Sequence, residues 1–364
     1  MPDYNSQIKE LEEQISKTKY NKKTQHAIGL YKAKLARLKE TQIKRSTGGK
    51  KGEGYSVKKS GDATVVICGF PSVGKSTLLN AITGAQSKVG AYAFTTLTVI
   101  PGLLEYKDAK IQILDVPGVV EGAAAGTGRG KEVLAVMRTA DLAILLIDVN
   151  FPEHLEVLKK EIYDSGLRLD QRLPNMKIAK KARGGIDAAS TVKLTKTDFA
   201  TIKDVMKEFR IFNADVVIRE DITIDQLIDY VEANKIYIPS LVVLNKIDMA
   251  ESKKLEEIKK KVRPEVCVSG ELKIGMEELK EAIFKKLNFI RVYCKEVGKK
   301  ADLEIPMIMK GGSTIGDMCD KLHRDFVNKF RFARVWGKSA KFPGQKLALS
   351  HKLLDKDVVQ IHMK

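Results

Sequence analysis

Residues 64–76 read TVVICGFPSVGKS, and this stretch decides the fold of the chain. Residues Thr64–Cys68 are mostly β-branched and apolar, which is typical of a buried strand. Residues Gly69–Ser76 match the phosphate-loop pattern G-x-x-x-x-G-K-[ST], and a helix-forming run begins at Ser76. A strand, a glycine-containing turn and a helix in this order are the context that a phosphate loop requires. The stretch therefore predicts an α/β domain of the P-loop type.

The residue types in this loop suit the phosphate groups of a nucleotide. Glycines let successive backbone N–H groups point at a β-phosphate, and the N-terminus of the helix adds a positive dipole. Lys75 is expected to bridge the β- and γ-phosphates, and the Ser76 hydroxyl to bind Mg²⁺. A purely structural turn is the alternative, but it would not require Lys75 and Ser76. The candidate phosphate-binding residues are Pro71, Ser72, Val73, Gly74, Lys75, Ser76 and Thr77.

Two further motifs supply candidates for magnesium binding and catalysis. Asp115 opens the motif DVPG after a predicted strand, where its carboxylate can hold Mg²⁺, and Gly118 can offer its amide to the γ-phosphate. In the run FTTLT, residues 94–98, we choose Thr96 over Thr95 as the threonine that reaches Mg²⁺ only while the γ-phosphate is present. A Thr-rich run is also typical of an edge strand. The candidate catalytic residues are Lys75, Thr96 and Gly118, and the candidate metal ligands are Ser76, Thr96 and Asp115.

The motif NKID, residues 245–248, predicts which base is bound. One carboxylate can accept hydrogen bonds from both N1–H and the 2-amino group of guanine, whereas adenine offers neither donor in that arrangement. Asp248 is therefore the expected specificity residue, with Asn245 bracing the base and the phosphate loop and Lys246 covering the ring. The sequence predicts binding of GTP and GDP. The candidate base-binding residues are Asn245, Lys246, Asp248, Ser269 and Gly270.

Val119 follows the DVPG motif, at a position where many GTPases have a glutamine that orients the attacking water. A valine side chain cannot orient water by hydrogen bonding. We therefore expect slow hydrolysis unless backbone, a bound ion, another side chain or a partner positions the water. Arg129, in the glycine-rich segment that follows, is interpreted as a solvated loop charge.

Positive charge is concentrated at the two ends of the chain, whose formal net charge is +18. Residues 1–60 hold 15 Lys and Arg against 6 Asp and Glu, residues 61–288 hold 33 against 32, and residues 289–364 hold 16 against 8. Basic ends around a nearly neutral middle favour contacts with a polyanion, RNA above all, over charge that merely aids solubility.

The sequence indicates neither a membrane span nor a secretion signal. No apolar run approaches the roughly 20 residues needed to cross a bilayer, and the start MPDY lacks the form of a secretion signal. We therefore expect a cytoplasmic protein without a membrane partner. The four cysteines are far apart and form no CxxC pair, so they indicate neither a disulfide framework nor a zinc site.

The pattern of predicted elements divides the chain into four regions. Residues 61–167 and 235–288 alternate strands with helices, which predicts a doubly wound sheet. Residues 1–60 predict a basic region of two helices, broken near Asn21 or Gly29, and a Gly- and Lys-rich linker. Residues 168–234 predict an inserted α/β subdomain. Residues 289–364 predict a small α+β unit. The strands expected in the doubly wound sheet are Thr64–Cys68, Lys110–Leu114, Leu142–Asp148, Leu241–Leu244 and Val266–Val268.

The C-terminal unit is expected to contain five short strands and a single helix, Ile315–Arg324. Its aromatic residues could meet RNA bases, but at their spacing they more often fill the core of a small domain. We therefore favour core positions for Phe326, Phe330, Phe332 and Trp336.

With these motifs assembled, the chain closely resembles the developmentally regulated GTP-binding proteins, relatives of the Obg GTPases. The resemblance rests on residues 69–76, 94–97, 115–118 continuing into 121–123, and 245–248, and it runs nearly end to end. It implies a basic helical region, a GTPase domain interrupted by an insertion that resembles a domain of a ribosomal protein, and a C-terminal TGS domain. It also implies a cytoplasmic GTPase associated with ribosomes, in some members bound to a dedicated stabilising protein.

Two residues depart from the pattern of this family and its relatives. Ser72 occupies the position at which potassium-using relatives have an asparagine, so direct K⁺ coordination is left open while a K⁺ effect on the rate is not excluded. Gly270 occupies a position that is usually alanine. The leading hypothesis is a GTPase switch that acts on the ribosome. The alternatives are a signalling or metabolic GTPase without RNA, and an RNA-binding scaffold in which GTP is mainly structural.

Overall fold

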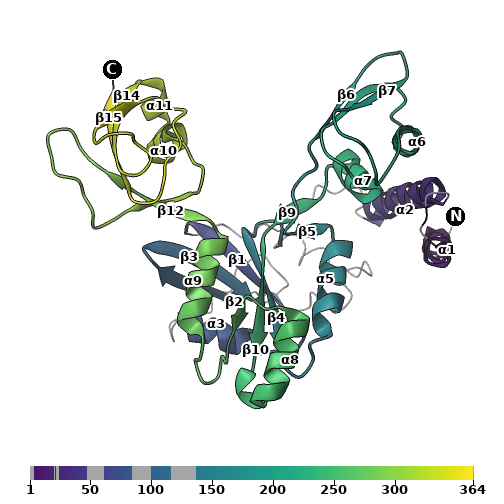
Figure 1. Cartoon of the computed structure of the whole chain (residues 1–364), viewed down its shortest axis with the longest axis horizontal. Helices are drawn as coiled ribbons and strands as arrows, with labels where there is room; N and C mark the ends of the chain where they lie inside the picture. Colours follow the sequence, from purple (N-terminus) through teal and green to yellow (C-terminus); the bar gives the residue numbers. More distant parts are fainter. Residues whose placement is uncertain are drawn as a thin grey trace. The chain divides into compact units, whose positions relative to one another are not determined.

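The computed structural model describes residues 4–19, 21, 24–46, 61–83, 100–115 and 137–363. They belong to two compact units, residues 1–53 with 166–237 and residues 54–165 with 238–364 (Figure 1). Among the described residues, no helix combines the length and the apolar character that crossing a membrane requires.

A six-stranded sheet with the order β11-β10-β4-β1-β3-β2 forms the centre of the second unit (Figure 1). All neighbouring strands are parallel except β2, which runs antiparallel to β3 at one edge. The five strands predicted from the sequence are present, and the doubly wound P-loop architecture is confirmed. The bounds are β1 Ala63–Cys68, β2 Ile100–Tyr106, β3 Ala109–Asp115, β4 Leu142–Asp148, β10 Ser240–Asn245 and β11 Val266–Cys267.

Helices cover this sheet and bury its apolar strands. Helices α3 and α9 share one hydrophobic cluster with the sheet, to which Leu78 and Leu279 contribute fully buried side chains. Parallel strands present their carboxyl ends at the same edge, so the phosphate loop after β1, Asp115 at the end of β3 and Asn245 at the end of β10 lie at that edge. The helices of this domain are α3 Lys75–Thr83, α5 His154–Asp164, α8 Ser252–Val262 and α9 Met276–Lys286, with a short 3₁₀ helix η1 at Ile247–Met249.

The edge strand β2 was not predicted, because its second and third residues are Pro101 and Gly102. Proline is tolerated in a strand chiefly at a sheet edge, which is where β2 lies. Packing explains why residue 102 is a glycine. A Cβ atom there would lie 2.6 Å from Thr83 Cγ2 and 2.7 Å from Leu79 Cδ1. Helix α3 therefore approaches β2 more closely than any larger residue would allow.

The C-terminal domain is a five-stranded sheet with the order β13-β12-β16-β14-β15. One helix was predicted up to Arg324, and this is wrong: His323 has an extended backbone (φ −169°) that ends α10, and α11 begins at the next residue. The imidazole Nδ1 of His323 accepts a hydrogen bond from the Asp325 N–H (3.2 Å), which caps the second helix. The elements are β12 Phe289–Cys294, β13 Met307–Lys310, α10 Ile315–Leu322, α11 Arg324–Asn328, β14 Phe330–Trp336, β15 Gln345–Leu347 and β16 Asp357–Met363.

The first unit contains the N-terminal helices together with the insertion. Its three-stranded sheet has the order β6-β8-β7, and β5 pairs separately with β9. Arg168 of β5 forms a buried bidentate ion pair with Asp229 of α7 (2.5 and 2.8 Å). The elements are α1 Tyr4–Lys17, α2 Gln25–Ser46, β5 Leu167–Leu169, β6 Met176–Lys180, β7 Ile186–Ser190, α6 Phe199–Glu208, β8 Ala214–Ile218, α7 Ile224–Glu232 and β9 Ile236–Ile238.

Helix α2 packs on α6 and α7 of the insertion. Of the two predicted boundaries between the helices, the one near Asn21 is found, whereas Gly29 lies inside α2. A Cβ atom at Gly29 would lie 3.0 Å from both Ile224 Cδ1 and Thr201 Cγ2, so the glycine permits close helix packing. An ion pair between Lys32 and Asp225 (2.7 Å) adds to this contact. The N-terminal helices therefore share a compact unit with the insertion.

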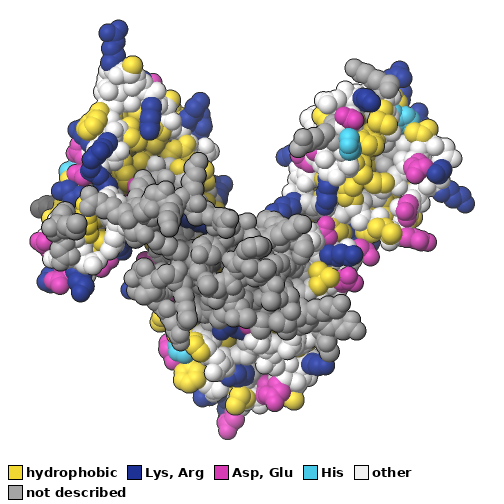
Figure 2. Space-filling view, turned by 180° about the vertical axis from the view of Figure 1, so that it is seen from behind, with side chains coloured by type: hydrophobic (Ala, Val, Ile, Leu, Met, Phe, Trp, Pro, Cys, Tyr) yellow, Lys and Arg dark blue, Asp and Glu magenta, His cyan; other side chains and the backbone are white. Residues whose placement is uncertain are grey.

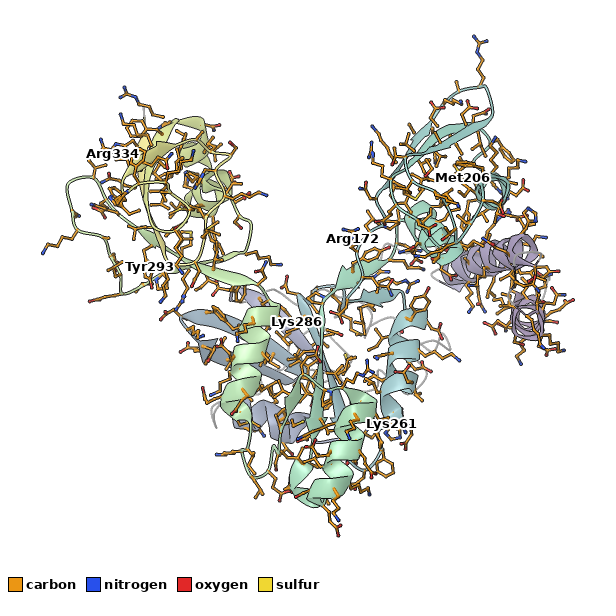
Figure 3. All side chains as sticks on the ribbon, viewed as in Figure 1. Arg172, Met206, Lys261, Lys286, Tyr293 and Arg334 are labelled. Carbon is orange, nitrogen blue, oxygen red and sulfur yellow. The ribbon has the colours of Figure 1, made fainter. Side chains whose placement is uncertain are left out.

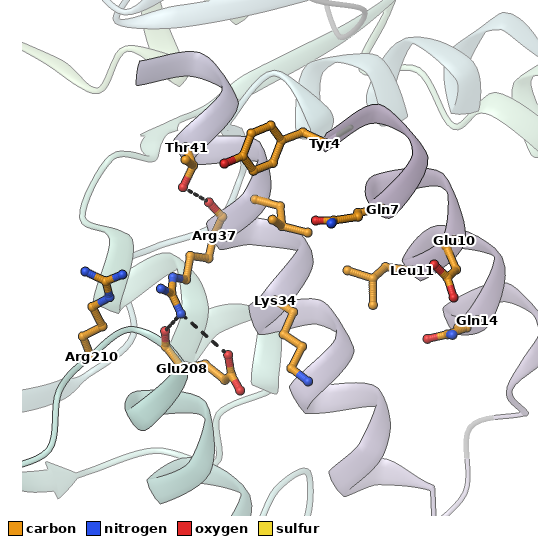
Figure 4. Close-up of a pocket in the computed structure, with 11 residues that line it drawn as sticks. Tyr4, Gln7, Glu10, Leu11, Gln14, Lys34, Arg37, Thr41, Glu208 and Arg210 are labelled. Atoms are coloured by element: carbon orange, nitrogen blue, oxygen red, sulfur yellow. Dashed lines mark hydrogen bonds and ion pairs between the residues drawn. The ribbon is translucent and has the colours of Figure 1, made fainter. Parts of the chain in front are cut away.

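A pocket of about 600 Å³ lies in this unit (Figure 4). Arg37 of α2 donates a hydrogen bond to the Glu208 carbonyl (3.0 Å) at its wall. Its lining residues come from α1, α2 and the end of α6: Tyr4, Gln7, Glu10, Leu11, Gln14, Lys34, Arg37, Leu38, Thr41, Glu208 and Arg210. No residue of the phosphate or base motifs is among them, so the pocket is separate from the nucleotide site predicted above.

Candidate nucleotide-binding site

The phosphate loop joins β1 to α3 and carries two residues with positive φ, Ser72 (60°) and Gly74 (94°). These dihedral angles curl the backbone into the concave turn that lets N–H groups converge. The Lys75 ammonium donates hydrogen bonds to the carbonyls of Gly69 (3.1 Å) and Phe70 (3.0 Å), which holds the cation across the loop. Of the candidate phosphate-binding side chains, Val73 is buried, Gly74 and Lys75 are half-buried, and Pro71, Ser72, Ser76 and Thr77 are exposed.

Asn245 connects the phosphate loop to the base loop. Its side-chain amide donates to the Val73 carbonyl (2.8 Å), and its Oδ1 accepts from the Gly270 N–H (3.1 Å). The side chain is almost fully buried, with 2% of the residue exposed. Residues from three separate segments are therefore fixed relative to one another by one amide group.

The glycines at positions 74 and 270 differ in what a methyl group would meet. A Cβ atom at Gly74 would lie 2.6 Å from Asn245 Nδ2 on a backbone that L-residues rarely adopt. At Gly270 it would meet Leu78 N, Leu78 Cα and Thr77 Cγ2 at 3.4–3.6 Å, which is ordinary van der Waals contact. An alanine would therefore fit at position 270.

We expect Gly74→Ala to weaken GDP binding about tenfold or more, because left-handed strain of about 1–2 kcal/mol is added to the clash with Asn245. Gly270→Ala, its matched control, should leave the affinity within about twofold. Isothermal titration of both variants with GDP measures the difference. Equal losses in the two variants would show that the contact between Gly74 and Asn245 does not control binding.

Lys246 is held by a residue that the sequence interpretation missed. Its ammonium forms an ion pair with Asp148 Oδ2 (2.7 Å) and donates to the Ser72 carbonyl (2.8 Å). Asp148 ends β4, in register with Asn245 of β10, and its Oδ1 accepts from the backbone N–H of Asn150 (2.9 Å). An acidic residue at the carboxyl end of the strand next to the NKID strand was the signal that could have identified it.

The remaining residues of the base motif are Asp248, Ser269 and Gly270. Asp248 is exposed on the 3₁₀ helix η1. Lys246 directly precedes this helix, and its positive φ of 61° turns the chain there. Ser269 is fully buried, and its hydroxyl accepts from the Leu272 N–H (3.2 Å). Ser269 also exchanges backbone hydrogen bonds with Ile274 (3.0 and 3.1 Å), which closes the loop that carries Gly270.

Asp115 lies at the end of β3 next to the start of α3. The Ser76 hydroxyl donates to Asp115 Oδ2 (2.8 Å). The other oxygen, Oδ1, is buried and has no hydrogen-bond partner among the residues that the structure describes. A buried carboxylate oxygen left in this state suits a hard cation with oxygen ligands, such as Mg²⁺. Thr96 and Gly118 fall outside the described residues, as do Thr95, Val119 and Arg129.

Aromatic stacking holds Phe70 of the phosphate loop, and the sequence analysis did not predict it. The Phe70 ring stacks on His154 (centroids 4.0 Å apart), and His154 stacks on Phe151 (5.2 Å). Below the loop, burial raises the pKa of Cys68 to about 12, so this thiol stays protonated at neutral pH. A neutral sulfur therefore lies beneath the loop, where a thiolate would oppose anion binding.

Family comparisons cover the chain from β1 to the C-terminal sheet. Residues 64–181 match the family described as 50S ribosome-binding GTPase, residues 183–289 match the C-terminal region of the same domain, and residues 290–363 match the TGS domain. These ranges include the phosphate loop, Asp115 and the NKID motif.

Curated relatives align over nearly the whole length. A protein of Methanocaldococcus jannaschii named as an uncharacterized GTP-binding protein is 56% identical, over 98% of this chain and 92% of its own. Developmentally-regulated GTP-binding protein 1 of Xenopus laevis is 42% identical, over 98% of both chains. Developmentally-regulated GTP-binding protein 2 of Homo sapiens is 40% identical, over 97% of this chain and 98% of its own. With this similarity over both domains and the P-loop architecture, the chain belongs to the family of developmentally regulated GTP-binding proteins, which bind guanine nucleotides and carry a GTPase domain and a TGS domain.

Proposed function

We propose that the protein is a cytoplasmic GTPase switch that acts on the ribosome, hydrolysing GTP slowly by itself and faster with a partner or an ion. The observation that carries the nucleotide part is the Asn245 brace. One buried amide joins the phosphate loop at Val73 to the base loop at Gly270. A movement of one loop when the nucleotide leaves is therefore transmitted to the other loop.

In this proposal the phosphate loop holds the β- and γ-phosphates through its backbone N–H groups and Lys75. The Lys75 ammonium moves from the carbonyls of Gly69 and Phe70 to the phosphates, which present a stronger acceptor. Asp248 accepts from guanine, and the Lys246 stem, fixed by Asp148, covers the ring face. Ser269 and Gly270 supply backbone contacts to the guanine carbonyl.

Magnesium fits the donor set beside the loop. Ser76 and Asp115 would hold it, with Thr96 joining in the GTP state. A bound Mg²⁺ would neutralise charge on the β- and γ-phosphates. The protein's own contribution is to keep Asp115 Oδ1 buried and without a competing donor from the described residues.

Hydrolysis is proposed to depend on Lys75, Thr96 and the Gly118 amide for charge stabilisation. Val119 cannot orient water, so the basal rate is expected to be low. With Ser72 in the phosphate loop, either K⁺ or a protein partner could accelerate hydrolysis. The dedicated stabilising protein implied by the family resemblance remains a proposed partner.

The ribosomal part of the proposal rests on charge and on the match to ribosome-binding GTPases. Residues 289–364 carry 16 Lys and Arg against 8 Asp and Glu, an excess that suits phosphate contacts. A signalling GTPase without RNA would not need this excess. A scaffold with structural GTP would not need the paired Ser76 and Asp115 beside the loop.

Co-sedimentation with ribosomes in GDP and in a non-hydrolysable GTP analogue tests the proposal. We expect several-fold more protein in the ribosomal pellet with the analogue, because a switch must bind its target differently in its two states. Single-turnover hydrolysis should also be faster with ribosomes than without. Equal pelleting in both nucleotides together with an unchanged rate would refute a ribosomal switch and favour the scaffold.

A further inference from the structure

The sheet of the C-terminal domain has one face that its helices do not cover. Ala333 and Val335 of β14 pack with α10 in the buried cluster of this domain. Because successive side chains along a strand point to opposite faces, Phe332, Arg334 and Trp336 lie on the other face. We call it the outer face. The expectation that all four aromatic residues fill the core is therefore wrong for Phe332 and Trp336, which are half-buried on the outer face.

Cross-strand pairing arranges the outer face in three rows. Directly paired residues place their side chains on the same face, and rows two residues apart along a strand are about 7 Å apart. A row with two cations lies between two rows that carry aromatic rings. The rows are Phe332 with His362; Lys346, Arg334 and Gln360; and Trp336, Val358 and Tyr293. Figure 3 labels Tyr293 and Arg334 on this domain.

Cations lie over the flat rings of this face. The Phe332 ring stacks on His362 (centroids 4.4 Å apart, planes at 20°), and the Lys346 ammonium lies 4.9 Å from the Phe332 centroid. The Lys295 ammonium lies 4.5 Å from the Trp336 ring centroid. Cation–π contacts at sites that water can reach are weak. A ligand with its own flat rings and negative charges can therefore displace them.

The three rows contain no acidic side chain, although Glu296 and Asp355 lie beside them, through Gln360 and Arg291. No outer-face position named above carries an acid, within the described residues 289–363. The main-chain carbonyl of Glu296 covers Gln360, from which it accepts a hydrogen bond (3.0 Å), whereas Arg334 and Lys346 are exposed. Figure 2 shows Lys, Arg, His and hydrophobic side chains on this domain, together with some Asp and Glu side chains. The acids are Asp317, Asp320 and Asp325 on the helices, Glu296, Asp302 and Glu304 after β12, Asp355 paired with Arg291, and the buried Asp357.

We propose that the outer face binds single-stranded RNA, with bases stacked on Trp336 and on the Phe332–His362 pair and phosphates held by Arg334, Lys346 and Lys295. Sheets that read single strands combine exposed rings, on which bases stack, with cations that follow the backbone. The inference deepens the RNA part of the proposed function and rests on it.

A single strand fits this face better than a duplex or an acidic peptide. A duplex keeps its bases stacked inward and would leave the rings without a partner. An acidic peptide would pair with Arg334 and Lys346 but would not need a flat ring beside each cation. Burial and the neighbouring cations Arg334, Lys346 and Arg331 lower the pKa of His362, so the imidazole that stacks on Phe332 is neutral at neutral pH.

Trp336 is the only tryptophan of the chain, so its fluorescence reports on this face alone. The full-length protein is titrated with an oligouridylate of about ten nucleotides, a length within the range that such sheets cover. We expect saturable quenching, because a base stacked on the indole quenches its emission. An RNA duplex of the same length, at the same salt concentration, should leave the emission nearly unchanged.

Two variants separate stacking from charge. Phe332→Ala should weaken oligouridylate binding about tenfold, the effect of losing one base stack, and Phe332→Tyr should restore it. Arg334→Glu with Lys346→Glu should weaken binding more than tenfold. The matched control is Lys329→Glu with Lys352→Glu, which changes the net charge equally at exposed positions next to α11 and α10, and it should cost less than about threefold.

Three results would overturn the inference: unchanged Trp336 emission while anisotropy of a labelled oligonucleotide shows saturation, equal losses in the two double variants, or tighter binding and equal quenching by polyglutamate. Failure of the proposed function looks different. If ribosome pelleting does not depend on the nucleotide but RNA still quenches Trp336, the switch is refuted and the RNA-binding face is retained. If pelleting depends on the nucleotide but RNA does not quench Trp336, only the RNA-binding face is refuted.

Discussion

Asp248→Asn is expected to lower GTP affinity about 100-fold or more and to make the protein prefer xanthine nucleotides. The carboxylate accepts two hydrogen bonds from guanine, and each bond to a charged acceptor contributes roughly 1.5–3 kcal/mol. An amide side chain presents one donor where guanine also has a donor, whereas xanthine has a carbonyl at that position. Because Asp248 is exposed on η1 and packs into no core cluster of the described residues, the fold should not change.

Competition of GDP and XDP for a fluorescent guanine nucleotide measures this change. The matched control is Glu251→Gln, which neutralises another exposed acid shortly after η1 and should leave both affinities unchanged. Thermal melting by circular dichroism checks that the variants remain folded. Retained selectivity for GDP in Asp248→Asn would refute the assignment of the base-recognition residue.

Lys75→Ala is expected to lower the single-turnover rate of GTP hydrolysis about 100- to 1000-fold, the usual effect of removing one strong donor to charge in the transition state. Two loop carbonyls hold this ammonium at 3.0 and 3.1 Å, so the cation stays beside the loop until the phosphates replace these carbonyls as its acceptors. The affinity for GTP should fall more than that for GDP, because Lys75 is expected to contact the γ-phosphate.

The rate is measured at saturating GTP and Mg²⁺, so that weaker binding does not mimic slower chemistry. Lys253→Ala, which removes an exposed cation from α8, serves as the control and should leave the rate unchanged. A rate within about threefold of the unmodified protein in Lys75→Ala would contradict the role of Lys75, because one lost donor should cost far more.

The local patterns of the sequence predicted the main sheet well. Each of its five predicted strands is a short apolar run next to a motif or turn, and each is found. The edge strand β2 was not predicted, because Pro101 and Gly102 are poor strand formers. Only the close approach of α3 explains the glycine. The end of α10 at His323 escaped because the residues on both sides of it form helices, so no local signal marks the break.

The sequence by itself determined the chemistry of the phosphate loop and the base motif, because each is a contiguous run whose residue types have one physical use. The tertiary structure decided how the runs are joined. Asn245 meets Val73 across 172 residues of chain, and Asp148 holds Lys246 because parallel pairing brings the ends of β4 and β10 into register. It also decided which aromatic rings of the C-terminal domain lie outside its core. A side chain's face depends on strand register, and register is set by long-range pairing that residue types alone do not specify.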